Sequence, residues 1–193
     1  MKAITSLIAG VDEVGKGALF GPVFAGAVIL SKSNELKLLS KGLKDSKKLN
    51  FRKRNQLVPL IKENSIDWAL GQASAKEIDN FGIRNATEKA MIRALEKFSS
   101  PPDLILVDGI LPIRCWKGKQ NTKVRGESHF PSIAAASVLA KEARDELIRR
   151  LADKYPFYGL EKNKGYGTEV HRTNLIKLGP TKLHRTSFLS KLK

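Results

Sequence analysis

Apolar residues occur along the chain in short runs and in helically spaced sets, and each pattern predicts an element. The runs at 7–11 and 21–30 are almost wholly apolar and predict two buried strands joined by a glycine-rich turn. Because that turn is short, we expect the two strands to pair as an antiparallel hairpin. Residues 65–74 alternate well enough to predict a third strand, and 101–109 reads as a short apolar strand ending in an acid.

Other segments place apolar residues three and four positions apart, which is the spacing of an amphipathic helix. This spacing predicts helices over 50–64, 82–98 and 131–155. Pro131 stands near the start of the last segment, as is common at a helix N-terminus, and Ser132 is the expected capping residue.

The order of these elements predicts the class of fold. Strands followed by helices, then another strand and a long helix, are typical of an α/β domain with a mixed sheet. We assign residues 1–155 to this domain, in which 111–126 holds five Lys or Arg and no acid and predicts a basic loop or hairpin. Residues 156–193 predict short helices and loops that form a C-terminal extension packed on the same domain.

The balance of charge points to the kind of partner. The 193 residues include 35 Lys plus Arg against 19 Asp plus Glu, a net charge of +16. A basic surface binds phosphate by releasing counterions, so a polyanion is the favoured partner. Binding to a membrane surface is the weaker alternative, because the chain has no long amphipathic basic helix and no lipidation signal. We therefore expect a nucleic-acid partner and no membrane.

Cysteine content and the start of the chain bear on where the protein works. The single cysteine, Cys115, excludes a disulfide framework and argues against a cysteine-based zinc site. It fits a reducing compartment, so we expect a cytoplasmic protein. The apolar start at 4–11 is too short to span a membrane, ends in acids and lacks a small-residue cleavage site, so we expect no signal peptide.

The scarce acids stand where strands are predicted to end. Asp12 and Glu13 follow the first strand, and Asp108 ends the strand within 101–109. Glu127 lies between the basic segment and the longest helix, directly after a glycine. Strands that end in acids at one edge of a sheet are a common way to build a carboxylate site.

Clustered carboxylates predict bound metal, because they cannot all ionise close together without a cation. All-oxygen ligation favours Mg²⁺ or Mn²⁺ over zinc, and two such ions can activate a water and stabilise the leaving oxygen of a phosphodiester. For any single acid, capping a helix or facing solvent is an equally good interpretation. Strand neighbours also point to opposite faces, so Asp12 and Glu13 share a site only if the strand twists or ends there, or if one acts through its backbone oxygen.

Seven motifs follow one another along the chain: GVDEVGKGALFGPVFAGAVIL (10–30), LKDSKKL (43–49), IDNFGIRNATEKAM (78–91), LVDG (106–109), SIAAASVLAKEARD (132–145), NKGYGTEVH (163–171) and GPTKLHRTSF (179–188). In this order, from about Ile8 to Phe188, they resemble those of bacterial ribonuclease HII, or type 2 ribonuclease H. The resemblance implies a ribonuclease-H-like mixed sheet flanked by helices, with a C-terminal helical extension. It implies metal-dependent hydrolysis of the RNA strand of RNA–DNA hybrids and incision at single ribonucleotides in duplex DNA, leaving 5′-phosphate and 3′-hydroxyl ends.

The resemblance also assigns the catalytic residues, which are the ligands of two Mn²⁺ or Mg²⁺ ions. They map onto Asp12, Glu13, Asp108 and Glu127. Asp is more usual in the family at the position of Glu127, whose side chain is one methylene longer. The resemblance favours a monomer acting on RNA–DNA hybrids and on ribonucleotide-containing duplex DNA.

Substrate-binding residues follow from the resemblance in the same way. The family's glycine loop is usually Gly-Arg-Gly and reads the ribonucleotide 2′-hydroxyl mainly through backbone groups. Here the loop is Gly15, Lys16 and Gly17, which keeps both glycines and the positive charge. Tyr166 matches the family tyrosine that packs beside the sugar at the junction.

Several further residues remain open candidates. Asp145 is the runner-up for the fourth carboxylate, although pairing with a neighbouring Arg or Lys is the stronger interpretation. His129 could approach the metals, whereas His171 and His184 are expected to support the C-terminal fold. A phosphate-contacting surface or a plain solvated helix face is an equally good interpretation of five basic residues: Lys47, Lys48, Arg52, Lys53 and Arg54.

Two other classes of protein compete with a ribonuclease. A non-catalytic nucleic-acid-binding protein accounts for the charge of +16 but not for acids at the strand ends. A nuclease of the same fold that cuts a different phosphodiester, such as a junction resolvase, accounts for both. Metal-dependent nicking of a duplex with one ribonucleotide, but not of the all-DNA duplex, separates the three.

Overall fold

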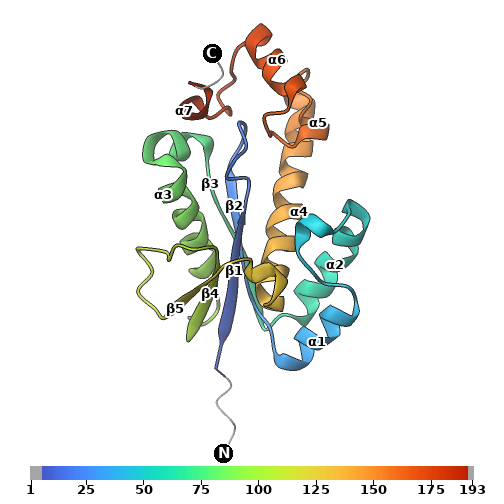
Figure 1. The fold of residues 1–193 in the computed structure, drawn as a ribbon, viewed down its shortest axis with the longest axis vertical. Helices are drawn as coiled ribbons and strands as arrows, with labels where there is room; N and C mark the ends of the chain where they lie inside the picture. The colour runs from blue at the N-terminus through green and yellow to red at the C-terminus, as the bar shows by residue number, and fades with distance from the viewer. Residues whose placement is uncertain (1–5, 191–193) are drawn as a thin grey trace, which may run out of the picture.

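A five-stranded mixed sheet forms the centre of the molecule (Figure 1). Its strand order is β3-β2-β1-β4-β5. The computed structural model describes residues 6–190, so the first two residues of the apolar start at 4–11 lie outside it. The strands are β1 (Ile8–Val14), β2 (Val23–Ile29), β3 (Asp67–Ala73), β4 (Leu104–Asp108) and β5 (Gln120–Lys123).

Helices cover both faces of this sheet and the end of the molecule opposite the N-terminus. They are α1 (Lys32–Ser40), α2 (Phe51–Asn64), α3 (Ala75–Leu95), α4 (Pro131–Lys154), α5 (Leu160–Asn163), α6 (Glu169–Leu178) and α7 (Thr186–Leu189), with short 3₁₀ helices η1 (Ser46–Lys48) and η2 (Gly126–Ser128). α3 lies on one side of the sheet, and α4 lies on the other with α1 and α2 outside it (Figure 1). No helix within residues 6–190 is both long and apolar enough to cross a membrane. The predicted α/β class with a mixed sheet is confirmed.

Strand pairing confirms the predicted hairpin and corrects one other expectation. β1 and β2 pair antiparallel, with Asp12 opposite Gly26, and β4 runs parallel to β1. The basic segment 111–126 is part loop and part strand, because β5 pairs in parallel with β4. It therefore forms no hairpin with its neighbour, and the loop before β5 is held by Gln120, whose side-chain amide exchanges hydrogen bonds with the main chain of Ile113.

The two faces of β1 and β2 pack against different helices. Apolar side chains such as Ala9 and Val11 lie in a core with α3. On the other face, a Cβ at Gly10 would lie 2.3 Å from the main-chain nitrogen of Ile133, and a Cβ at Gly26 would lie 2.3 Å from the carbonyl oxygen of Ala136. The backbone of α4 therefore lies directly on the sheet, which explains the run of small residues at its start.

One helix start and one helix cap differ from the predictions. α3 begins at Ala75, where Ser74 and Glu77 form a reciprocal capping box, and Gly82 interrupts it with a φ of +77°. α4 begins at Pro131 as predicted, but the residue before it is Phe130, and Ser132 is buried inside the helix and does not cap it. α1 is not among the predicted elements.

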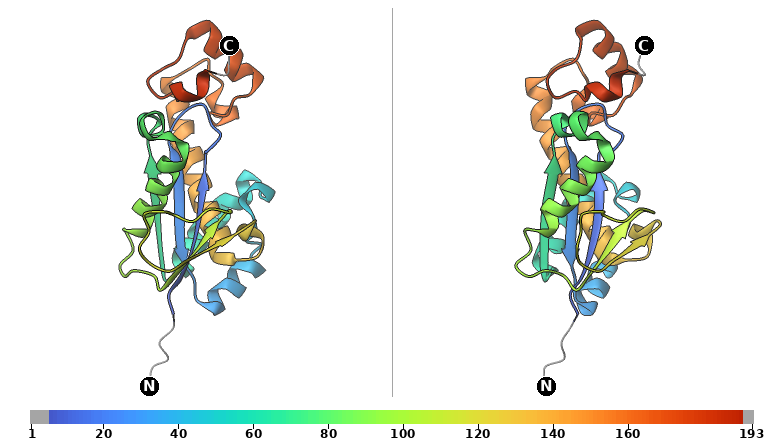
Figure 2. Two further views of the ribbon diagram at one scale, coloured as in Figure 1. Left: turned by 60° about the vertical axis from the view of Figure 1, so that its left-hand side comes forward. Right: turned by 90° about the vertical axis from the view of Figure 1, so that its left-hand side faces the viewer.

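The segment after α4 covers the turn between β1 and β2, at the end of the molecule opposite the N-terminus, as the views in Figure 2 show. It packs around Phe20 with a small apolar cluster that includes Tyr158 and Leu175. Main-chain hydrogen bonds join the two segments, among them one of 2.8 Å from the Leu19 N–H to the Gly165 carbonyl. Short helices and loops are found here as predicted, while the division of the chain after residue 155 stays a prediction.

Candidate active site

Asp12 lies beside Asp108, the last residue of the parallel strand β4, but Asp12 itself is inside β1, which continues to Val14 and does not end before the two acids as predicted. The register pairs Val11 with Val107, so its next step sets Asp12 beside Asp108. Alternation along β1 turns Asp12 toward α4, as it does Gly10, and the Ser137 hydroxyl of α4 lies within hydrogen-bonding reach of the Asp12 carboxylate. Asp12 is 6% exposed, which makes it one of the few buried acids in the chain.

Glu127 approaches Asp108 from η2, the short turn that leads into α4. The Gly126 N–H donates a hydrogen bond of 2.7 Å to Asp108 Oδ1, and the Glu127 carboxyl lies within hydrogen-bonding reach of the same side chain. A Cβ at Gly126 would lie 2.6 Å from Ile133 Cδ1, so the close approach of η2 to β4 requires the glycine. Glu127 Oε2 is buried without a hydrogen-bond partner among residues 6–190.

Glu13 occupies the opposite face of β1 from Asp12. It lines a cavity of about 520 Å³ together with Lys16, Asp108 and side chains of α3 such as Ile83. Its Oε1 lies 3.0 Å from Lys16 Nζ, so the ammonium group of the glycine loop balances its charge. The strand therefore presents its two acids on two faces, as strand geometry requires.

Burial and like charge raise the pKa of two of these carboxyls. Burial, followed by the charge of Glu13, raises the pKa of Asp12 to about 8. Burial, followed by a hydrogen bond with Glu127, raises the pKa of Asp108 to about 6. Both shifts mean that the ionised forms are costly in the protein alone, and a bound cation would lower that cost.

The donor set fits a hard divalent cation, although the side chains do not form a closed cage. Within residues 6–190, no three His, Cys, Asp or Glu side chains are close enough together to hold one ion. Mg²⁺ is commonly held by one or two carboxylates together with waters and substrate phosphates, so the two neighbouring aspartates suit it. The unpartnered Glu127 Oε2 is a further oxygen in the same place.

The glycine loop and Tyr166 lie together, as the resemblance implies. Ala18, next to Gly17, forms an isolated antiparallel bridge with Tyr166. Lys16 and Gly17 are exposed, and nothing lies within 4 Å of where a Cβ of Gly17 would be. Gly15, in contrast, is buried with a φ of +89°. The fold itself thus requires Gly15 and leaves Gly17 open to a ligand.

The structure shows which of the remaining sequence candidates are buried and which are exposed. Asp145 is buried and lies 2.8 Å from Lys141 Nζ and 3.7 Å from Arg54, so the expected pairing with basic neighbours is confirmed. The prediction that Arg54 lies on an exposed surface is wrong, because its side chain is buried against Glu142 and Asp145. His129 is exposed, whereas the rings of His171 and His184 are buried and 3.1 Å apart at their Nε2 atoms.

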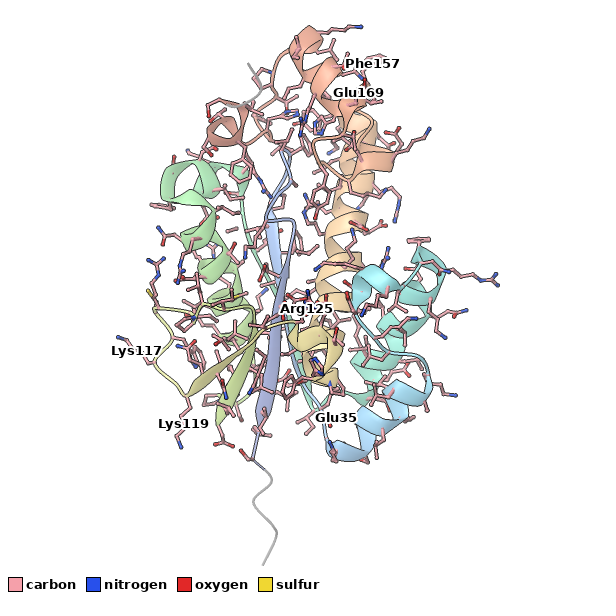
Figure 3. All side chains as sticks on the ribbon, viewed as in Figure 1. Glu35, Lys117, Lys119, Arg125, Phe157 and Glu169 are labelled. Carbon is pink, nitrogen blue, oxygen red and sulfur yellow. The ribbon has the colours of Figure 1, made fainter. Side chains whose placement is uncertain are left out.

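Basic side chains lie at different distances from the sheet. Lys47, Lys48 and Arg52 are exposed and can still meet phosphate. Figure 3 shows Arg125 in front of the sheet next to η2, whereas Lys117 and Lys119 lie farther out on the loop that leads into β5. Phe157 and Glu169 lie at the far end of the molecule, on the segment after α4.

Sequence reasoning did not single out three polar residues close to the site. Ser137 contacts Asp12, and its hydroxyl is 2.9 Å from that of Ser46 in a buried pair. Arg144 packs beneath Gly15 and Tyr166, with its guanidinium carbon 5.4 Å from the centre of the tyrosine ring. Ser46, Ser137 and Arg144 all lie within quoted motifs, but a motif does not show which way a side chain points.

Comparison with known proteins settles the family. The family model described as Ribonuclease HII matches residues 9–191. The chain belongs to the ribonuclease HII family. A relative from Prochlorococcus marinus (strain NATL1A), named Ribonuclease HII, is 79% identical over 192 residues, which cover 100% of this chain and 98% of the relative.

Solved structures similar to this ribonuclease HII family member support the fold. The ribonuclease H2 from Pyrococcus horikoshii OT3 matches with a TM-score of 0.80 at 24% identity, covering 96% of each chain. Bst-RNase HIII in complex with Mn²⁺ matches with a TM-score of 0.71 at 20% identity, covering 97% of this chain and 70% of that one. The ribonuclease-H-like fold with its mixed sheet is therefore confirmed.

Proposed function

We propose that the protein is a metal-dependent endonuclease that hydrolyses the RNA strand of RNA–DNA hybrids and incises duplex DNA at single ribonucleotides. Membership of the ribonuclease HII family supports the reaction class. The observation that carries the proposal in this chain is that Asp12 of β1 and Glu127 of η2 each approach Asp108 at the end of β4, close to the exposed glycine loop.

Mn²⁺ or Mg²⁺ is the proposed cofactor, in a two-ion site held by Asp12, Glu13, Asp108 and Glu127. Because the Glu13 side chain lies on the other face of β1, Glu13 would take part through its main-chain oxygen. The raised pKa values of Asp12 and Asp108 support a bound cation, and a structurally similar protein, Bst-RNase HIII, was solved in complex with Mn²⁺. When bound, such ions supply an activated water and stabilise the leaving 3′ oxygen, so products carry a 5′-phosphate and a 3′-hydroxyl.

The protein's own groups choose and position the substrate. The exposed Gly17 leaves room for a sugar to approach the main chain, and Tyr166 lies close enough to pack against the neighbouring sugar. Lys16 balances Glu13 and places a positive charge at the mouth of the cavity. Because the 2′-hydroxyl distinguishes RNA from DNA, selectivity has to act through groups of this kind.

A duplex-cleavage assay tests the proposal. One substrate is a DNA duplex with a single ribonucleotide, the second is a long RNA–DNA hybrid, and the third is the matched all-DNA duplex. We expect nicking of the first two with Mg²⁺ or Mn²⁺, no cleavage of the third, and loss of all activity with a chelator. Binding without cleavage would instead favour a non-catalytic binding protein, and cleavage of branched all-DNA substrates would favour a resolvase.

The proposed function also bears on the location, oligomeric state and partners of the protein. We place it in the cytoplasm as a monomer, with RNA–DNA hybrids and ribonucleotide-containing DNA as its partners. The one cysteine, Cys115, is exposed and unpaired in the structure, which suits a reducing compartment.

A further inference from the structure

Two arginines are buried behind the glycine loop, and within residues 6–190 all their hydrogen bonds go to main-chain oxygens. Arg144 and Arg185 are both 0% exposed. Arg144 donates to the carbonyls of Phe20, Pro22 and Lys164 at 2.9–3.0 Å. Arg185 donates at 2.9 Å to the carbonyls of Gly21 and Lys16. Four of these five carbonyls belong to the segment 16–22.

Neither guanidinium is neutralised by a salt bridge with any residue between 6 and 190. Arg185 Nη2 is also buried with no hydrogen-bond partner in that range. Burial, reinforced by the charge of Arg144, lowers the pKa of Arg185 to about 9. An unpaired buried charge is costly, so its presence beneath a loop that meets the ligand calls for a functional reason.

One contact connects this charge to the exposed part of the loop. The Lys16 carbonyl that accepts from Arg185 belongs to the same peptide group as the N–H of Gly17. Gly17 is exposed, and open space surrounds the position where its Cβ would be. We propose that Arg185 is a positioning residue, which holds and polarises the Lys16–Gly17 peptide so that its outward N–H binds an oxygen of the ribonucleotide.

The physical basis is the cooperativity of hydrogen bonds. A cation at the carbonyl end of a peptide group draws electron density from its N–H, and such polarisation strengthens the next hydrogen bond in the chain. Arg144 fixes the far end of the same turn through Phe20 and Pro22, so the loop is held at both ends. The inference rests on the proposed function, because the ligand oxygen belongs to its substrate.

A matched control separates positioning of the loop from attachment of the C-terminal segment. Asp79 of α3 accepts hydrogen bonds of 2.6–3.0 Å from the main chain and hydroxyls of Thr186 and Ser187, the two residues after Arg185. It therefore ties down the same segment without touching the glycine loop. Asp79→Ala loosens the attachment and removes a carboxylate whose charge acts on Arg185, but it leaves the guanidinium on the Lys16 carbonyl. Arg185→Met loosens the attachment and also removes the charge from that peptide group.

The experiment measures kcat and KM on the single-ribonucleotide duplex for both variants and for a double-mutant cycle of Arg185→Met with Gly17→Ala. We expect Arg185→Met to lower kcat by roughly tenfold with little change in KM, Arg185→Lys to recover part of the loss, and Asp79→Ala to leave kcat near wild type. The double variant should be no slower than the slower single variant, because both changes act on one peptide.

The outcomes distinguish this inference from the proposed function. If the wild type does not nick the duplex, the proposed function fails. If the wild type nicks it but Arg185→Met and Asp79→Ala lower kcat alike, or the cycle is additive, Arg185 has only a structural role and the inference is overturned. If Arg185→Met does not fold, the cycle with Arg185→Lys decides on the same criterion.

Discussion

Gly15 packs directly on the guanidinium of Arg144: a Cβ at Gly15 would lie 2.2 Å from Arg144 Nε. Gly15 also has a φ of +89°, which side chains other than glycine rarely adopt. Gly17, two residues later, has no neighbour within 4 Å of its Cβ position. The two glycines of one motif therefore differ: the fold requires Gly15, whereas the space beside Gly17 is open.

This difference predicts opposite behaviour of two alanine variants. Gly15→Ala should lower the free energy of unfolding by about 2 kcal/mol or more, because it combines a clash with backbone strain. Gly17→Ala should change it by less than about 0.5 kcal/mol, yet lower kcat/KM by roughly tenfold to a hundredfold by obstructing the sugar. Urea unfolding and steady-state kinetics on the single-ribonucleotide duplex measure both. Full activity in Gly17→Ala would show that no sugar approaches this loop.

The raised pKa of Asp12 predicts how the stability of the metal-free protein depends on pH. Burial raises this pKa to about 8, so the folded protein keeps a proton that the unfolded chain, with a pKa of about 4, releases. The free energy of unfolding should therefore fall as the pH rises from about 4 to 8. Asp12→Asn cannot ionise and should be more stable than wild type at pH 8 by about 1 kcal/mol or more, with a smaller difference at pH 5.

Urea unfolding in the presence of a chelator at both pH values checks this. Part of the pH dependence should remain in Asp12→Asn, because burial also raises the pKa of Asp108, to about 6. An equal loss of stability between pH 5 and pH 8 in wild type and variant would contradict the account of Asp12.

Glu127 and Asp145 should respond differently to loss of charge. Glu127→Gln removes a carboxylate beside Asp108 and should raise the metal concentration needed for half-maximal activity, whereas Glu127→Asp should keep substantial activity. Asp145→Asn weakens a buried pairing with Lys141 and Arg54, so it should lower stability without changing the metal requirement. Measuring the cleavage rate as a function of metal concentration distinguishes the two residues. If Asp145→Asn raises the metal requirement and Glu127→Gln does not, Asp145 is the metal ligand and Glu127 is not.

Tyr166 tests the ring and its hydroxyl separately. Tyr166→Phe removes a hydrogen bond worth about 0.5–1.5 kcal/mol, so kcat/KM should fall by roughly tenfold or less, and Tyr166→Ala should cost more. Neither variant loses a phosphate contact, so the dependence of binding on salt should stay as in wild type. A steeper loss in Phe than in Ala, or a changed salt dependence, would remove Tyr166 from the sugar contact.

The fold could be predicted from sequence where apolar pattern determines structure. The β1–β2 hairpin and α4 follow from long apolar runs and helical spacing. β5 could not be predicted, because its four residues, QNTK, are polar and pair only through their main chain. The sequence predicts that this helix starts at residue 82, because a glycine resembles a helix boundary. In the structure α3 starts at Ala75 and continues past Gly82, which is its one non-helical residue.

In the candidate site, too, only the residues that follow a sequence pattern could be predicted. Asp12 and Asp108 could be recognised because each follows an apolar run, and a parallel register then sets them side by side. The sequence alone predicts an exposed Arg54, which is wrong, because its partner Glu142 lies 88 residues away in the chain. Arg144 and Arg185 could not be assigned, because a guanidinium that bonds to distant carbonyls leaves no pattern in the sequence.

The carboxylates of Asp12 in β1 and Asp108 at the end of β4 are the centre of this account, and one measurement tests them most directly. It compares the rate at which wild type, Asp12→Asn and Asp108→Asn nick a duplex with one ribonucleotide at saturating Mn²⁺ and Mg²⁺, with folding of each variant verified by circular dichroism. We predict that each variant is fully folded and slower than wild type by about 100-fold or more, because each loses a charge that positions the reacting groups. Turnover near the wild-type rate in either folded variant would contradict the assignment of the site.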